Sequence, residues 1–404
     1  MSGPRRKLTT EERGTIKALD WMMPPAKTES ALYLDQVPEV DRFLTEISNV
    51  KELALDTEGA SFHRFLDRIY LLQISTRDQS AIIDPLPIGS PAKLGQLLES
   101  KNVEVVFHDA DYDLRLLHQD YGWHATNIFD TRVASQLLGI KSFGLAALLE
   151  QFFEVKLDKK HQRADWSMRP LTPDMLAYAA QDTRYLLQLK DHMKGELKRR
   201  GRMHWAEEEF ARLEGTRWEA EDGMEGFLRI KGARDLSRRE LAVLREVANW
   251  RNAVAAQLDR ATFRVMGNEV LLEIARRAPK STSELGAIKG MPKGMIERAG
   301  ADIVAAIRRG MDAPEAELPK FPKGQRWNKD RDFDDKVGRL KAVRDAAATR
   351  LELDPGVLCS RERLENVARS GAKTVQDLAA VPDLRRWQIE EMGEGFVRGL
   401  GGGG

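Results

Sequence analysis

The sequence contains a single cysteine, Cys359, and this scarcity narrows the chemistry open to the chain. One cysteine excludes an internal disulfide framework and any cysteine-rich zinc site. A metal site would therefore have to be built from carboxylates or histidines. Carboxylate oxygens favour hard cations, so the sequence points towards magnesium or manganese.

Long apolar runs are also missing. No segment approaches the roughly 20 consecutive apolar residues that a membrane-spanning helix needs. The first residues, MSGPRRKLTTEERG, lack the apolar stretch of a secretory signal. We therefore expect a cytoplasmic protein that has no membrane partner.

The charges of the chain nearly cancel, but they are unevenly distributed along its 404 residues. Residues 31–186 carry 16 Lys or Arg against 23 Asp or Glu, whereas residues 231–310 carry 16 against 9. An acidic catalytic part beside a basic binding part would suit an enzyme that acts on a polyanion such as nucleic acid. Ordinary solvated surfaces would give the same counts, so charge alone leaves both interpretations open.

The region from residue 31 to residue 130 alternates short β-type runs with helical patterns, which predicts an α/β domain. Three strand candidates follow one another between residues 52 and 86, so we expect a mixed sheet with an antiparallel meander followed by parallel strands. The predicted strands are 31–35, 52–58, 69–76, 80–86 and 103–109, and the predicted helices are 38–48, 90–100 and 110–122.

From residue 131 onwards the pattern is helical almost throughout. Residues 171–201 predict one long helix that begins with Thr172 as N-cap and Pro173 at its first position. This helix is expected to end near Gly201, with basic residues in its last turns. Its end would mark the edge of the α/β domain.

The C-terminal half predicts two helical domains. The segment SELGAIKGMP (283–292) resembles QDLAAVPDLR (376–385), which indicates one small helical fold used twice. A segment rich in proline and charge separates the two copies and is typical of a linker. The predicted division is an N-terminal extension at 1–30, an α/β domain at 31–205, a connector at 206–230, a first helical domain at 231–312, a linker at 313–330, a second helical domain at 331–400 and a flexible glycine tail at 401–404.

Four acids lie where predicted strands end or helices begin. Asp56 and Glu58, one residue apart at the end of a strand, point to the same side and repel each other unless a cation lies between them. Asp113 follows another strand, and Asp182 shares a helix face with Tyr178. In an open α/β sheet, ligands collect at the carboxyl ends of strands. Four carboxylates in one cleft would require neutralisation, which two divalent cations about 4 Å apart could supply while promoting in-line phosphodiester displacement.

Each of these residues has an ordinary alternative explanation when it is taken alone. Asp56 and Glu58 could form a solvated strand end, Asp113 could be a first-turn helix acid, and Asp182 could pair with a basic residue. Tyr178 is a poor base at neutral pH, because an unperturbed phenol has a pKa of about 10. We therefore expect the phenol to orient an attacking water by a hydrogen bond.

The joint pattern resembles the ribonuclease D family of the DEDD exonuclease superfamily. Its three motifs appear as LDTE, HDADYDL and YAAQD. The last matches the subgroup with a tyrosine four residues before the final Asp, since Ala177 stands where the other subgroup has a histidine. The resemblance implies a ribonuclease H-like mixed-sheet domain in which Asp56, Glu58, Asp113 and Asp182 bind two divalent metal ions, Mg or Mn, and Tyr178 holds the nucleophilic water.

The two helical domains resemble HRDC domains, which occur in two copies at the C-terminus of ribonuclease D. Residues 61–86 and 162–171 are similar to ribonuclease D and, more closely, to its relative on the eukaryotic nuclear exosome. The resemblance implies a 3′-5′ exoribonuclease that releases nucleoside 5′-monophosphates from RNA with a single-stranded 3′ end, in tRNA 3′ maturation or in stable-RNA processing and decay. A 3′-5′ DNA exonuclease and a catalytically silent nucleic-acid-binding scaffold are the alternatives, because the acids alone do not distinguish the two sugars.

Several other residues are candidates for contacts with substrate. The segment DTEGASFHR lacks the aromatic residue that often directly follows the Glu in bacterial ribonuclease D, and Phe62 is a possible substitute. Arginines can clamp phosphate and Trp can stack on bases. Solvated loops and core packing are the ordinary alternatives, and Gln73 is expected to be a hydrogen-bonded core residue. The candidates are Phe62, His63, Arg64, His108, Trp166 and Arg169.

Overall fold

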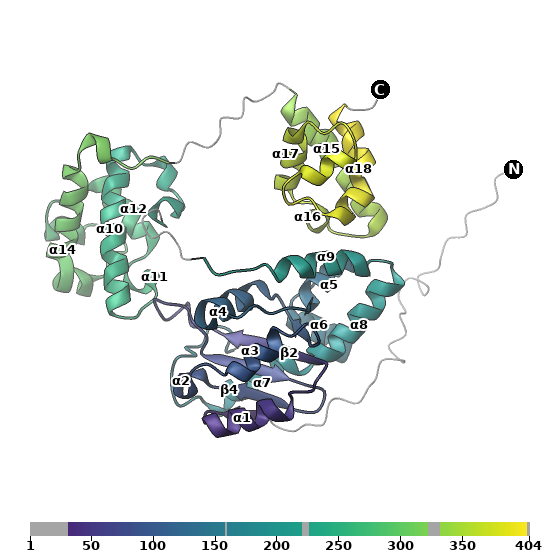
Figure 1. Cartoon of the computed structure of the whole chain (residues 1–404). Helices are drawn as coiled ribbons and strands as arrows, with labels where there is room; N and C mark the ends of the chain where they lie inside the picture. Colours follow the sequence, from purple (N-terminus) through teal and green to yellow (C-terminus); the bar gives the residue numbers. More distant parts are fainter. Residues whose placement is uncertain (1–30, 158–159, 220–225, 322–331, 402–404) are drawn as a thin grey trace.

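The computed structural model describes residues 31–157, 160–219, 226–321 and 332–401. The N-terminal extension expected at 1–30, the second half of the linker expected at 313–330 and the last three glycines lie outside these residues. Figure 1 shows an α/β domain joined to two groups of helices. Within the described ranges, no helix combines the length and the apolar character needed to cross a membrane.

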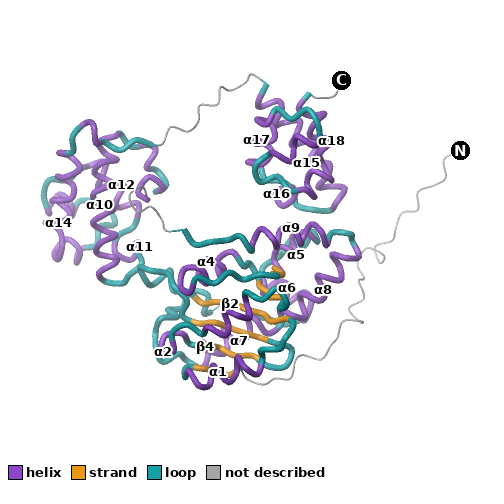
Figure 2. Tube along the Cα trace, in the orientation of Figure 1, coloured by secondary structure: helices purple, strands orange, loops and turns teal. Residues whose placement is uncertain are grey.

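A single six-stranded mixed sheet forms the centre of the α/β domain (Figure 2). Strands β2, β3 and β4 form an antiparallel meander, and the other neighbouring pairs are parallel, which confirms the predicted mixed sheet. The last strand, which has three residues, was not predicted from the sequence. In spatial order the strands are β1 (Leu32–Leu34), β4 (Ser80–Ile83), β3 (Leu71–Ser75), β2 (Glu52–Glu58), β5 (Glu104–Phe107) and β6 (Ile128–Asp130).

Helices cover both faces of this sheet, and the alternation of side chains along β2 assigns each residue to one of them. Leu53 and Leu55 are fully buried in the core formed with α1, α3 and α4. Ala54 faces the opposite side, in a core that also contains residues of α5, α8 and α9. The helices of this domain are α1 (Val37–Glu46), α2 (Pro85–Ile88), α3 (Ala92–Leu98), α4 (Asp111–Tyr121), α5 (Thr131–Leu137), α6 (Leu145–Phe153), α7 (Pro173–Arg184), α8 (Leu186–Arg199) and α9 (Met203–Leu213).

The long helix predicted at 171–201 is two helices, so this prediction was wrong in part. Thr172 is the N-cap, and its side chain accepts a hydrogen bond from the backbone N–H of Met175, as expected. The chain then breaks at Tyr185, between α7 and α8. Helix α7 packs against β2, β3 and β4, whereas α8 packs mainly against α5. The two halves pack against different partners on the same face of the sheet, α7 mainly on β3 and β4 and α8 mainly on α5.

The two C-terminal groups of helices differ in how they attach. The first has its own hydrophobic core. The second shares one continuous core with α5, α8 and α9 of the α/β domain. In both groups the echoing segment forms a short helical turn before the last long helix. The first group comprises α10 (Arg238–Gln257), α11 (Thr262–Val265), α12 (Asn268–Arg277), α13 (Thr282–Gly286) and α14 (Lys293–Asp312), and the second comprises α15 (Phe333–Leu351), α16 (Pro355–Leu358), α17 (Arg361–Ser370) and α18 (Arg386–Leu400).

Candidate active site

Three of the four acids lie together at the end of β2. Asp56 and Glu58 are the fifth and seventh residues of this strand, and alternation places both on the face covered by α7. Asp182 projects from α7 onto the same place. One carboxylate oxygen from each of these three residues lies within 4.8 Å of the others. The group is half-buried and has the spacing of ligands around one cation.

The fourth acid, Asp113, reaches the same strand from the first turn of α4. It is only 4% exposed. Its Oδ1 accepts hydrogen bonds from the backbone N–H of Thr57, at 3.0 Å, and from the Thr57 hydroxyl, at 2.5 Å. The Thr57 contacts therefore fix Asp113 beside the residue that separates Asp56 from Glu58. The role of Thr57 was not predicted from the sequence, although its position between two acids was a usable signal.

Burial and mutual repulsion raise the pKa of all four carboxyls. Desolvation is the larger cause for each, and the charge of a neighbouring acid adds to it. For Asp182, burial and the nearby Asp113 raise the pKa to about 7. The four groups together thus resist full ionisation at neutral pH unless a positive charge joins them. An all-carboxylate set of this kind fits a hard divalent cation.

Tyr178 lies one turn before Asp182 on α7. Its ring centroid is 5.8 Å from that of His161 and 6.0 Å from that of Trp166. Trp166 is 1% exposed, so in this structure it packs behind the tyrosine and is not presented to solvent. Burial of the Trp166 ring favours the packing alternative for this residue, while its contact with substrate stays a prediction.

Arg169 is tied to the protein by several hydrogen bonds. Its Nε donates to Oδ2 of the buried Asp84 at 2.5 Å, and its terminal nitrogens donate to the carbonyl oxygens of Tyr70 and Trp166. These bonds anchor the segment around Trp166 to the edge of the sheet. The arrangement favours a structural role for Arg169, and a phosphate contact stays a prediction.

The loop after Glu58 carries three further candidates, and each of them contacts other parts of the chain. Phe62 is 44% exposed and meets Phe263 of α11 edge to face. His63 bonds the carbonyl oxygen of Arg163 at 2.9 Å. Arg64 donates to Ser167 and pairs with Asp259 of the first helical group.

The remaining candidate, His108, lies at the end of β5. Its Nδ1 is 2.9 Å from the Thr131 hydroxyl. Burial, aided by the charge of Arg132, lowers the pKa of His108 to about 4, so the ring is neutral at physiological pH. A neutral, hydrogen-bonded histidine at a strand end agrees with the ordinary alternative.

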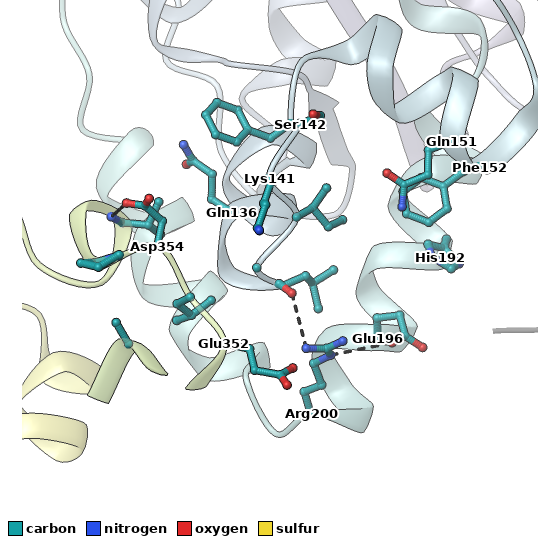
Figure 3. A pocket seen from close by; sticks show the side chains of 18 of the residues that line it. Gln136, Lys141, Ser142, Gln151, Phe152, His192, Glu196, Arg200, Glu352 and Asp354 are labelled. Atoms are coloured by element: carbon teal, nitrogen blue, oxygen red, sulfur yellow. Dashed lines mark hydrogen bonds and ion pairs between the residues drawn. The ribbon is translucent and has the colours of Figure 1, made fainter. Parts of the chain in front are cut away.

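A cavity of 1410 Å³ lies elsewhere, between α6 and α8 of the α/β domain and the α15–α16 turn (Figure 3). Its lining includes Lys141, Phe152, His192, Glu352 and Asp354, and it contains neither Tyr178 nor any of the four acids. Arg200 on its rim bonds the carbonyl oxygen of Leu138. The acid cluster, and not this cavity, therefore carries the chemistry expected from the sequence.

Comparison with known proteins identifies the class. Residues 33–198 match a family model described as a 3′-5′ exonuclease, and residues 240–307 and 335–400 both match the model of the HRDC domain. The acid cluster at the end of β2 lies within the first match. The fold and these matches together define a 3′-5′ exonuclease that carries two HRDC domains.

The chain belongs to the ribonuclease D family. It is 30% identical over 359 residues to ribonuclease D of Nitrobacter hamburgensis, an alignment that covers 88% of this chain and 91% of that relative. The predicted activity is confirmed: the protein is a 3′-5′ exoribonuclease, a hydrolase of RNA phosphodiester bonds.

Solved structures confirm the predicted fold class. A protein from Bifidobacterium adolescentis superimposes with a TM-score of 0.79 at 25% identity, over 94% of this chain and 99% of that chain. Escherichia coli RNase D, described as an exoribonuclease involved in structured RNA processing, gives a TM-score of 0.72 at 24% identity, over 92% of this chain and 99% of that chain. The mixed-sheet domain followed by two helical domains is thus a fold shared with RNase D.

Proposed function

We propose that Asp56, Glu58, Asp113 and Asp182 hold two divalent cations, magnesium or manganese, during hydrolysis of the last phosphodiester bond of an RNA chain. The clustering of three carboxylates within 4.8 Å carries this proposal. Bound cations would supply an activated water at neutral pH and stabilise charge on the leaving oxygen. The predicted role of the four acids as cation ligands is part of this proposal.

The protein's own side chains position the reacting groups. Thr57 holds Asp113 in place through two hydrogen bonds from neutral donors, its backbone N–H and its hydroxyl. These bonds orient the carboxylate but do not neutralise its negative charge. Tyr178 stands one helical turn from Asp182, where its hydroxyl can orient the attacking water. The contacts of its ring with Trp166 and His161 limit the directions that the phenol can take. Hydrolysis with attack on the terminal phosphorus leaves a nucleoside 5′-monophosphate and a shortened 3′-hydroxyl end.

The substrate that we propose is RNA with a single-stranded 3′ end. An unpaired end is required because the terminal phosphodiester must reach acids that lie at the carboxyl end of the central strand β2, where α4 and α7 also contribute acids. The excess of basic residues over 231–310 provides phosphate contacts that do not depend on base sequence. Membership of the ribonuclease D family leads us to propose tRNA 3′ maturation or stable-RNA processing and decay in the cytoplasm.

Digestion of 5′-labelled RNA tests this function. We expect stepwise shortening from the 3′ end and release of mononucleotides with magnesium or manganese, and no shortening in EDTA. The Asp56→Ala variant should bind RNA and fail to cut it. A matched DNA oligonucleotide in parallel tests the alternative of a DNA exonuclease. Activity that persists in EDTA would contradict the mechanism, and equal rates on DNA and RNA would contradict the substrate.

A further inference from the structure

Gln73 is a buried amide that lies beside the acid cluster and was expected to be an ordinary core residue. It belongs to β3 and stands directly opposite Asp56 in the antiparallel ladder. Its side chain has no exposed surface. Residues directly opposite in such a ladder point to the same face, so the amide shares with Asp56 the face covered by α7.

The amide of Gln73 is satisfied on one side only. Its Nε2 donates to Oε1 of Glu58 at 3.4 Å. When a cation holds Glu58 ionised, its carboxylate can only accept hydrogen bonds, so the amide must turn its NH₂ group towards Glu58. Its carbonyl oxygen then points elsewhere, and within the described residues this buried oxygen has no hydrogen-bond partner.

Ser75 is a nearby buried polar residue whose hydrogen bonds are complete, which contrasts with Gln73. Ser75 lies two positions further along β3, on the same face as Gln73, and is 1% exposed. Its hydroxyl contacts the hydroxyls of Ser80 at 2.8 Å and Thr183 at 2.7 Å. A buried polar group without a partner costs free energy, so an oxygen left unpaired next to a ligand site suggests a partner that arrives with the ligand.

We infer that Gln73 is a positioning residue of the cation site. Its NH₂ group holds the Glu58 carboxylate in the orientation in which it binds a cation, and its carbonyl oxygen accepts a hydrogen bond from a water molecule that hydrates the cation. Magnesium in proteins usually keeps several of its waters, which supplies the missing donor. This inference rests on the proposed function and assigns to that site a residue outside the four acids and Tyr178.

Replacement of the amide by an apolar side chain of similar size tests the inference. In full-length Gln73→Met we expect manganese affinity, measured by titration calorimetry, to fall by about 10-fold to 100-fold, as for other residues that orient metal ligands. Without metal the variant should melt at the wild-type temperature or above it, because an unpaired buried acceptor has been removed. With saturating magnesium it should melt below wild type.

Cleavage kinetics separate a positioning role from a role in the fold. Raising the magnesium concentration should restore much of the rate of Gln73→Met at saturating RNA, because the ligands themselves are intact. Gln73→Leu provides a second variant of similar volume if the methionine variant does not fold. The control is Ser75→Ala, which should lower the melting temperature equally with and without metal and leave manganese affinity unchanged.

Two outcomes overturn the inference. If a folded Gln73→Met or Gln73→Leu binds manganese with wild-type affinity, Gln73 only packs the core. If Ser75→Ala weakens manganese binding as much as Gln73→Met does, the effect comes from the strand and not from the amide. Asp56→Ala separates these failures from failure of the proposed function, because it must lose manganese binding if the acids hold the cation.

Discussion

Trp205 of α9 and Trp387 of α18 stack with their ring centroids 4.8 Å apart and their planes 20° from parallel. Both rings are almost fully buried, although they lie 182 positions apart in the sequence. The indole N–H of Trp387 also donates to Glu209 at 3.0 Å, and Arg385 pairs with the same carboxylate. The second HRDC domain is thus packed onto the exonuclease domain as part of one core.

We therefore predict that Trp387→Ala destabilises both domains together. Loss of a buried tryptophan should lower the free energy of unfolding by about 3–5 kcal/mol. Urea unfolding followed by circular dichroism would measure this. Arg386→Ala is the matched control, since the Arg386 side chain is exposed and its backbone N–H still donates to Glu208. If the exonuclease domain of Trp387→Ala unfolds at the same urea concentration as in the wild-type protein, the two domains do not share a core.

Asp182→Asn should abolish most of the activity and yet stabilise the metal-free protein. Loss of one ligand charge from a two-cation site is expected to slow cleavage by about 100-fold to 1000-fold, which corresponds to several kcal/mol of lost charge stabilisation. Without metal, removing one carboxyl relieves repulsion within the cluster. Cleavage rates and melting temperatures in EDTA measure both effects. A metal-free variant that melts well below wild type would speak against electrostatic strain.

Stability should depend on pH in opposite ways with and without a cation. The pKa of Asp182 is raised from 3.8 to about 7, so between these values the folded protein binds more protons than the unfolded chain. Metal-free stability from this group is therefore present below pH 3.8 and is lost as pH rises towards 7. Magnesium competes with these protons, so the stabilisation that it provides should grow over the same range. Melting curves from pH 4 to pH 8, with EDTA or magnesium, measure this, and metal-free melting temperatures that rise steadily across this range would contradict it.

Tyr178→Phe should lower the turnover number by about 100-fold, the size of effect expected when an attacking group loses its orientation. The cation ligands are unchanged, so manganese affinity should stay at the wild-type value. Tyr185→Phe serves as the control, because Tyr185 stacks on Phe153 and the loss of its hydroxyl should leave turnover unchanged. If Tyr178→Phe cuts RNA at the wild-type rate, the phenol does not hold the water.

Strand β2 could be predicted closely, whereas strand β6 and the division between α7 and α8 could not. The strand expected at 52–58 has the same bounds as β2, because its apolar pattern and terminal acids are local signals. The three-residue strand β6 was missed, and the helix expected at 171–201 divides at Tyr185. Its two halves pack against different strands and helices, and local periodicity does not reveal a change of partner.

The candidate site also combines residues that the sequence predicted with contacts that only the structure shows. The four acids and Tyr178 were predicted as site residues from motif spacing, and the structure brings Asp56, Glu58 and Asp182 together. The anchoring of Asp113 by Thr57 was not, because that contact joins residues 56 positions apart. The predicted substrate residues His63 and Arg64 form internal contacts, the latter with Asp259. A sequence shows that an arginine can bind an anion but does not show which anion lies nearest.

By itself the sequence determined the mixed sheet, the repeated helical domain and the positions of the acids in the motifs that resemble ribonuclease D. These features depend on side-chain periodicity and on short motifs, which the chain expresses locally. Only the tertiary structure decided that Gln73 stands opposite Asp56 with one unpaired oxygen, and that Trp387 joins the core of a domain that ends far earlier in the chain. Such relationships depend on which surfaces meet when the apolar faces of distant segments are buried together.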